Sequence, residues 1–183
     1  MINTIFPKIL FIGLDYSGKT TIIKRLKDMK VILHNINYLF KDNEIIEIYP
    51  TPFIDVTNLS IDGKHFAAIE VSGNLRYRDY WENFYYEIDA IVFVIDGTDY
   101  QRLPIVKELI TKLFSTISYD IPVEILINKS DIESCVNKAT LRRYLELDFL
   151  NSKFKFDISS SIAFNSYGVK EAIKSITNNL CYK

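Results

Sequence analysis

A glycine-containing octapeptide, GLDYSGKT at residues 13–20, carries the residue types that bind phosphate groups. It fits G-x-x-x-x-G-K-[S/T] in full, after an apolar stretch and before a helical one. Gly18 lets the backbone turn, so that successive amide N–H groups can surround an anion at a helix N-terminus. Lys19 adds positive charge for the β and γ phosphates, and the Thr20 hydroxyl suits Mg²⁺. The candidate contacts are Gly13, Asp15, Tyr16, Ser17, Gly18, Lys19, Thr20 and Thr21.

A second motif, NKSD at residues 128–131, follows another apolar stretch, PVEILI. The Asp131 carboxylate can accept hydrogen bonds from the ring N–H and the exocyclic amine of guanine, which adenine cannot match. The aliphatic stem of Lys129 can cover the base, and Asn128 opens the motif. The tetrapeptide alone is equally typical of a solvated turn. Its place at the end of a predicted strand, downstream of the phosphate loop, favours a guanine site.

Both motifs need a scaffold that brings them to one side, and strand-like and helix-like segments alternate along the chain. Asp62 and Gly63 separate two extended stretches, which predicts an antiparallel hairpin. The expected strands are residues 8–13, 54–61, 64–71, 90–96, 122–128 and 153–159, and the expected helices are residues 21–30, 77–86, 102–118, 138–146 and 169–180. This order predicts an α/β fold of the P-loop NTPase type: a mostly parallel six-stranded sheet with one antiparallel edge strand and helices on both faces.

The composition suits one well-packed domain over residues 1–183, with 48% apolar residues and a formal net charge of −1. The 22 Lys and Arg residues against 23 Asp and Glu leave no positive excess for nucleic-acid binding. No apolar stretch is long enough to cross a bilayer. Two cysteines cannot build a disulfide framework, so we expect a reducing, cytoplasmic setting.

Together the two motifs resemble those of small GTPases, and more narrowly of the Arf and Arf-like family, from about Lys8 to Leu180. Residues 76–99 are similar to that family's switch II helix and the strand after it. Ser72 and Gly73, followed by RYR at residues 76–78 and by Trp81, most resemble the Arf-like branch that recruits the BBSome coat in ciliated cells.

The resemblance implies a GTP/GDP switch that uses Mg²⁺ and works with protein effectors, an exchange factor and an activating protein. It places Thr51 where the family's switch I threonine binds Mg²⁺, which makes Thr20 and Thr51 the implied metal ligands. It places the Gly73 N–H on the γ phosphate. It also places Ser159, Ser160 and Ser161 at the guanine, with Ser160 as the implied contact. Membrane traffic, including recruitment at the ciliary base, is the implied setting.

Switch II departs from the family at two positions, reading EVSGN at residues 70–74. Glu70 is one methylene longer than the family's aspartate, which holds a Mg²⁺-bound water. Asn74 is one methylene shorter than the glutamine that orients the attacking water. Positioning dominates phosphoryl transfer, so we expect slow intrinsic hydrolysis from the catalytic pair Gly73 and Asn74. The alternative is that switch II adjusts and a partner activates hydrolysis normally.

Other departures concern recruitment. An insertion at about residues 30–43 precedes switch I, and Pro52 restricts Thr51 to extended conformations. Ile2 stands where the family carries a myristoylated glycine, and Cys181 is third from the end, outside a prenylation box. We therefore expect no direct lipid anchor, and a monomer that protein partners recruit to membranes.

Two other classes stay open. A non-cycling, nucleotide-loaded scaffold of the same fold is suggested by Glu70 and Asn74. A P-loop kinase acting on a small molecule shares the first motif but does not explain NKSD. In switch II, the spacing of Tyr77, Trp81, Phe84 and Ile88 predicts core packing, which turns some of the neighbouring tyrosines outward.

Overall fold

The computed structural model describes residues 6–32, 53–118, 120–149, 153–178 and 180. Most of the insertion predicted at 30–43 therefore lies outside the described residues, as do Ile2, Thr51, Pro52 and Cys181. The elements, in chain order, are β1 (Lys8–Ile12), α1 (Lys19–Ile32), β2 (Ile54–Ile61), β3 (Lys64–Val71), η1 (Leu75–Phe84), β4 (Ala90–Asp96), η2 (Tyr100–Arg102), α2 (Leu103–Thr116), β5 (Val123–Asn128), α3 (Lys138–Tyr144), η3 (Leu147–Phe149), β6 (Phe156–Ser160) and α4 (Val169–Asn178), where η marks 3₁₀ helices.

The described strands form one six-stranded sheet in the order β2-β3-β1-β4-β5-β6. Every neighbouring pair is parallel except β2 and β3, which form the predicted hairpin. Its turn residues Asp62 and Gly63 have φ values of 49° and 81°, as a tight hairpin turn requires. The predicted fold class, a mostly parallel sheet with one antiparallel edge strand, is confirmed.

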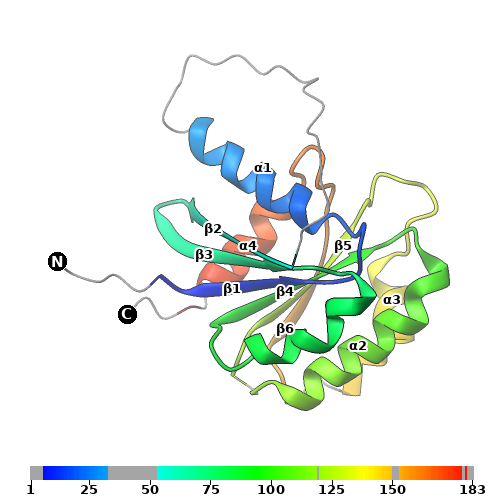
Figure 1. Cartoon of the computed structure of the whole chain (residues 1–183). Helices are drawn as coiled ribbons and strands as arrows, with labels where there is room; N and C mark the ends of the chain where they lie inside the picture. Colours follow the sequence, from blue (N-terminus) through cyan, green and yellow to red (C-terminus); the bar gives the residue numbers. More distant parts are fainter. Residues whose placement is uncertain (1–5, 33–52, 119, 150–152, 179, 181–183) are drawn as a thin grey trace.

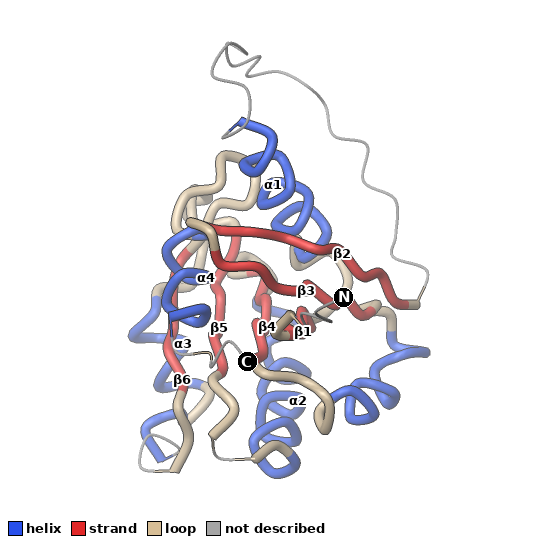
Figure 2. Tube along the Cα trace, turned by 90° about the vertical axis from the view of Figure 1, so that its left-hand side faces the viewer, coloured by secondary structure: helices blue, strands red, loops and turns tan. Residues whose placement is uncertain are grey.

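Helices cover both faces of the sheet (Figures 1 and 2). The alternation along β1 shows why: Leu10 and Ile12 belong to one buried cluster, while Ile9 and Phe11 belong to the other. The first cluster takes in residues of α2, α3 and η1, and the second takes in residues of α1 and α4. Within the described residues, no helix has the length and apolar character that crossing a bilayer requires.

The segment after β3 differs in detail from the predicted α-helix at 77–86, because it is a 3₁₀ helix that starts at Leu75. Trp81 is its fully buried anchor, and Ile88 is buried after it. Tyr77 and Phe84 are only half-buried, and both contact the ring of Phe53. The helix predicted at 102–118 divides into η2 and α2, with a proline in the first turn of α2, where proline is tolerated.

A carboxyl group is buried inside the sheet at Glu124 on β5. Burial raises the pKa of Glu124 from 4.5 to about 7, a hydrogen bond with Ser159 partly opposes this rise, and the charge of Asp157 adds to it. Glu124 Oε1 has no hydrogen-bond partner among the described residues. The fold therefore favours the protonated form.

We expect Glu124 to make stability depend on pH. Because its pKa is higher in the fold than in the unfolded chain, its contribution is fully present below pH 4.5 and is lost as pH rises through about 7. Glu124→Gln should remove up to about 3 kcal/mol of this dependence, measured by urea unfolding from pH 5 to 9 with saturating nucleotide. Glu133→Gln, at an exposed site, is the control. Parallel profiles for the parent and Glu124→Gln would contradict the expectation.

Candidate nucleotide-binding site

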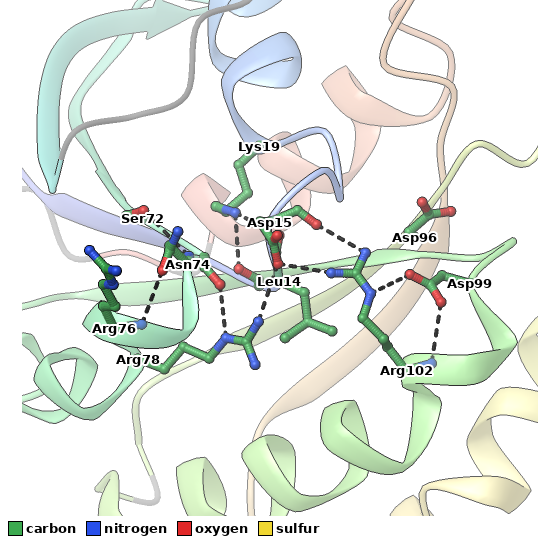
Figure 3. Close-up of polar contacts among 12 residues, drawn as sticks. Leu14, Asp15, Lys19, Ser72, Asn74, Arg76, Arg78, Asp96, Asp99 and Arg102 are labelled. Carbon is green, nitrogen blue, oxygen red and sulfur yellow. Dashed lines mark hydrogen bonds and ion pairs between the residues drawn. The ribbon is translucent and has the colours of Figure 1, made fainter.

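The loop between β1 and α1 holds Lys19 at its centre. The Lys19 ammonium donates hydrogen bonds to the carbonyl oxygens of Gly13 and Leu14, both at 2.9 Å (Figure 3). Lys19 is only 5% exposed, and burial lowers its pKa to about 8, although the charges of Glu70 and Asp15 oppose that effect. Lys19 is therefore still largely charged at neutral pH, and it is fixed where a phosphate group would lie on the loop amides.

One cavity of about 760 Å³ joins the two sequence motifs. This volume is within the range of small-molecule sites. The predicted residues that line the cavity are Asp15, Tyr16, Gly18, Lys19, Thr20, Thr21, Gly73, Asn74, Asn128, Lys129 and Asp131. Gly13 and Ser17 lie behind the wall, where their carbonyl oxygens accept hydrogen bonds from Lys19 and Asn128. The cavity wall also includes Ile132 and Tyr77, which the motifs did not indicate.

Asn128, at the end of β5, connects three loops and is only 2% exposed. Its Nδ2 donates to the Ser17 carbonyl in the phosphate loop at 2.8 Å. Its Oδ1 accepts from the Ala163 backbone N–H at 2.9 Å and from the Ser161 hydroxyl at 3.3 Å. The phosphate end and the base end of the cavity are thus held together through a single buried amide.

Lys129 is held by an ion pair with Asp96 at the end of the neighbouring strand β4, at 2.5 Å. Burial would raise the pKa of Asp96, but hydrogen bonds from Lys129 and Thr98 outweigh it and lower that pKa. The charged end of Lys129 is therefore fixed, and its aliphatic stem remains at the cavity beside Asp131.

The three serines predicted to touch the base do not line the cavity. Ser159 and Ser160 are the last residues of β6, because they pair in register with Leu126 and Ile127 of β5. Ser161 is fully buried behind Asn128. The residues that line the base end are instead Ile162, Ala163 and Phe164. A run of three serines does not show where a strand ends. Because β6 continues through Ser160, the residues that line the base end lie three positions further along the chain than the predicted serines.

Switch II lies directly against the phosphate loop (Figure 3). A Cβ atom on Gly73 would lie 2.3 Å from the Asp15 nitrogen, so only glycine permits this approach. Arg78 Nε donates to the Gly73 carbonyl at 2.8 Å, and another Arg78 nitrogen lies 3.2 Å from the Asp15 carboxylate. Arg102 contacts the same carboxylate at 2.8 Å. The buried Trp81 indole N–H donates to the Ser72 carbonyl at 3.0 Å.

Sequence spacing did not indicate either arginine, because Arg78 and Arg102 lie 63 and 87 residues from Asp15. Their two guanidinium groups meet one carboxylate at the rim of the phosphate loop. This arrangement holds the Gly73 backbone beside the cavity.

The residues that could hold Mg²⁺ also lie at this wall. The Thr20 hydroxyl donates to Glu70 Oε1 at 2.5 Å, and Glu70 is 2% exposed. Mg²⁺ prefers one or two protein oxygens together with phosphate oxygens and water, so a hydroxyl and a carboxylate beside the phosphate loop fit it. Among the described residues, no cluster of three or more His, Cys, Asp or Glu side chains could hold a metal ion by itself.

A mostly parallel sheet with a phosphate loop after β1 and an N-K-x-D motif after β5 defines a guanine-nucleotide-binding domain of the P-loop class. The model of the ADP-ribosylation factor family matches residues 4–180. The chain therefore belongs to the Arf family of small GTPases, whose members bind GTP and GDP. The family resemblance of the motifs is confirmed.

The chain is 30% identical to ADP-ribosylation factor-like protein 5 of Caenorhabditis elegans, over 94% of this chain and 90% of that protein. It is also 30% identical to ADP-ribosylation factor-like protein 6 of Caenorhabditis briggsae, over 94% of this chain and 85% of that protein. Its structure is similar to the Arl6 BBS3 small GTPase from Trypanosoma brucei, solved with the bound nucleotide analogue GppNp. The TM-score is 0.78 and the identity 26%, with 94% of this chain and 95% of that chain covered.

Proposed function

We propose that this chain is a Mg²⁺-dependent GTP/GDP switch whose intrinsic hydrolysis is slow and whose GTP form binds protein effectors. The observation that carries the proposal is that one cavity joins the phosphate loop, switch II and the base motif. Gly73, Thr20 and Lys19 all line this cavity, so a γ phosphate bound on this loop would be within reach of all three. Binding of the γ phosphate can then change the conformation of switch II.

Slow hydrolysis is supported by the position of Asn74. Its side-chain Oδ1 accepts from the Arg76 backbone N–H at 3.1 Å and caps η1. To orient an attacking water, the Asn74 amide must leave this cap, and it is also shorter than the glutamine of the family. Glu70 is engaged by the Thr20 hydroxyl, so its carboxylate must rearrange as well before it can hold a metal-bound water. Both changes disturb the positioning on which phosphoryl transfer depends.

We expect Asn74→Gln to raise the single-turnover rate of GTP hydrolysis by about tenfold or more, because the longer amide can reach the water without the cap. The lost cap should lower the stability of the fold by about 1 kcal/mol. Asn74→Asp is the matched control: it keeps a capping oxygen but has no amide, so its rate should stay at the parent level. A parent rate equal to that of an ordinary small GTPase would refute slow hydrolysis.

The switch itself is tested by the nucleotide content of the purified chain and by its conformation with GDP and with a non-hydrolysable GTP analogue. Protection of switch II amides from hydrogen exchange should differ between the two states. Identical protection in both states, with nucleotide bound, would favour the non-cycling scaffold. Transfer of the γ phosphate from GTP to a small molecule would instead favour the kinase alternative.

An apolar surface beside the cavity supports effector binding. Phe53 forms ring contacts with Tyr77, Tyr80 and Phe84, and Ile54 and Val56 on the edge strand β2 are exposed. Tyr80 is exposed as well, whereas Phe53, Tyr77 and Phe84 are half-buried. Several exposed apolar side chains on one part of a surface are typical of protein interaction sites. Because η1 contributes to this surface and also contacts the phosphate loop, the bound nucleotide can control it.

The cellular setting follows from the proposed switch. We expect a monomer in the cytoplasm that an exchange factor loads, an activating protein resets, and effectors recruit to membranes or to the ciliary base. The similarity to Arf-like proteins, Arl6 among them, supports this setting. Flotation with liposomes, with and without cytosolic protein, tests it: recruitment should need both the GTP analogue and cytosol, and binding to bare liposomes would contradict it.

A further inference from the structure

Phe164 is a large aromatic residue on the wall of the nucleotide cavity. It lies between β6 and α4, lines the cavity at the end that holds Lys129 and Asp131, and is 64% exposed. The backbone around it is fixed. The Ala163 N–H is bonded to Asn128, and an antiparallel bridge between Ile162 and Tyr167 closes the turn. An aromatic side chain is therefore presented to the base end of the cavity on a fixed loop.

One side of the Phe164 ring already has a partner. The Arg25 guanidinium lies 5.2 Å from the ring centroid, in a cation–π contact. Arg25 is one helical turn beyond Thr21 on α1, and Thr21 lines the same cavity. Arg25 Nε is buried and has no hydrogen-bond partner in the described part of the chain. Arg25 thus supports the ring from α1, and most of the ring surface remains open.

We propose that Phe164 is a stacking platform for the nucleotide base, supported by Arg25 and facing the stem of Lys129 across the base. The inference rests on the proposed nucleotide binding and deepens it. Lys129 is tied to Asp96 and lines the same cavity, so its stem can supply an apolar surface to the other face of the base. The resulting stack is guanidinium, phenyl ring, base and lysine stem.

The stack divides the recognition of the base between two kinds of contact. Every purine has a π face, so stacking on Phe164 strengthens binding without choosing among purines. The choice of guanine is made at the edge of the base by Asp131, through hydrogen bonds. Loss of the ring should therefore lower the affinity for guanine and for hypoxanthine nucleotides by the same factor. This equal loss distinguishes Phe164 from a residue that hydrogen-bonds to the edge of the base.

The chain contains a matched control for this contact. Phe149 is 78% exposed and has a cation–π contact with Lys153 at 5.8 Å, similar to that of Phe164. It does not line the cavity. Phe149→Ala therefore removes an exposed ring of the same kind without touching the site.

The test is the affinity of the full chain for GDP, for inosine diphosphate and for inorganic pyrophosphate, which has no base. Phe164→Ala should lower the affinity for both nucleotides by about tenfold, mainly through faster dissociation, and should leave the affinity for pyrophosphate unchanged. Phe164→Trp should restore the affinity. Arg25→Gln should lower the affinity for both nucleotides by a smaller factor than Phe164→Ala does. Phe149→Ala should match the parent.

Several outcomes would overturn the inference. These are parent-like nucleotide affinity in Phe164→Ala, an equal loss for pyrophosphate, or an equal loss in Phe149→Ala. Parent-like affinity in Arg25→Gln would overturn the support assigned to Arg25. If the parent chain bound no guanine nucleotide, the proposed function would fail instead, and this result is distinct from all the others.

Discussion

The variant Asp131→Asn is expected to bind xanthosine diphosphate in preference to GDP. The Asp131 carboxylate lines the cavity and can accept two hydrogen bonds from the edge of guanine. An asparagine offers one acceptor and one donor, so one guanine donor would face the Asn N–H group. Xanthine has a carbonyl oxygen in place of that exocyclic amine, and it pairs with the same amide.

The expected effect is large because the bonds to guanine are charge-assisted. Hydrogen bonds to a charged group contribute about 1.5–3 kcal/mol each, so loss of one, with a donor left facing a donor, should weaken GDP binding by about 100-fold. The measurement is displacement of a fluorescent nucleotide by GDP and by xanthosine diphosphate. Glu133→Gln makes the same change of charge at an exposed position outside the cavity and should leave both affinities unchanged. Unchanged preference in Asp131→Asn would show that Asp131 does not contact the base.

The parts of the fold and site that the sequence predicts are those fixed by contiguous residues. The Asp62-Gly63 pair determines the hairpin, since both residues have positive φ. The phosphate loop and N-K-x-D each carry their chemistry within a few positions. The alternation of apolar strands with helices then places both loops at the same, carboxyl edge of one parallel sheet, after β1 and after β5 with β4 between them, and the structure brings them into one cavity.

The parts that the sequence does not predict depend on register and on distant partners. The register of β6 against β5, which decides that Ala163 and not Ser160 meets Asn128, is a property of the assembled sheet. The two arginines on Asp15 come from elements more than 60 residues away. Phe164 was missed because an aromatic residue in a loop becomes informative only when a cavity is seen beside it. Thr51 stays a prediction, since it lies outside the described residues.

The variant Gly18→Ala is expected to lose nucleotide binding. Gly18 has a φ of +100°, and a Cβ atom there would lie 2.1 Å from Nδ2 of Asn128. Asn128 would have to move, and both of its backbone bonds, to the Ser17 carbonyl and from the Ala163 N–H, would weaken. Each buried polar group left without a partner costs about 1–3 kcal/mol. The phosphate end and the base end are disturbed together, so GDP affinity should fall by at least about 100-fold.

Gly63→Ala separates this clash from backbone strain. Gly63 also has a positive φ, +81°, but nothing lies within 4 Å of its added Cβ. The Gly63→Ala variant should therefore lower the free energy of unfolding by about 1 kcal/mol, through the left-handed conformation alone, and should leave the GDP dissociation rate unchanged. GDP dissociation rates and thermal unfolding of both variants provide the comparison.

If Gly18→Ala bound GDP with an affinity within threefold of the parent's, Asn128 could not be the rigid link between the two ends of the cavity. If Gly63→Ala released GDP as fast as Gly18→Ala, strain in the fold, and not the contact with Asn128, would govern binding.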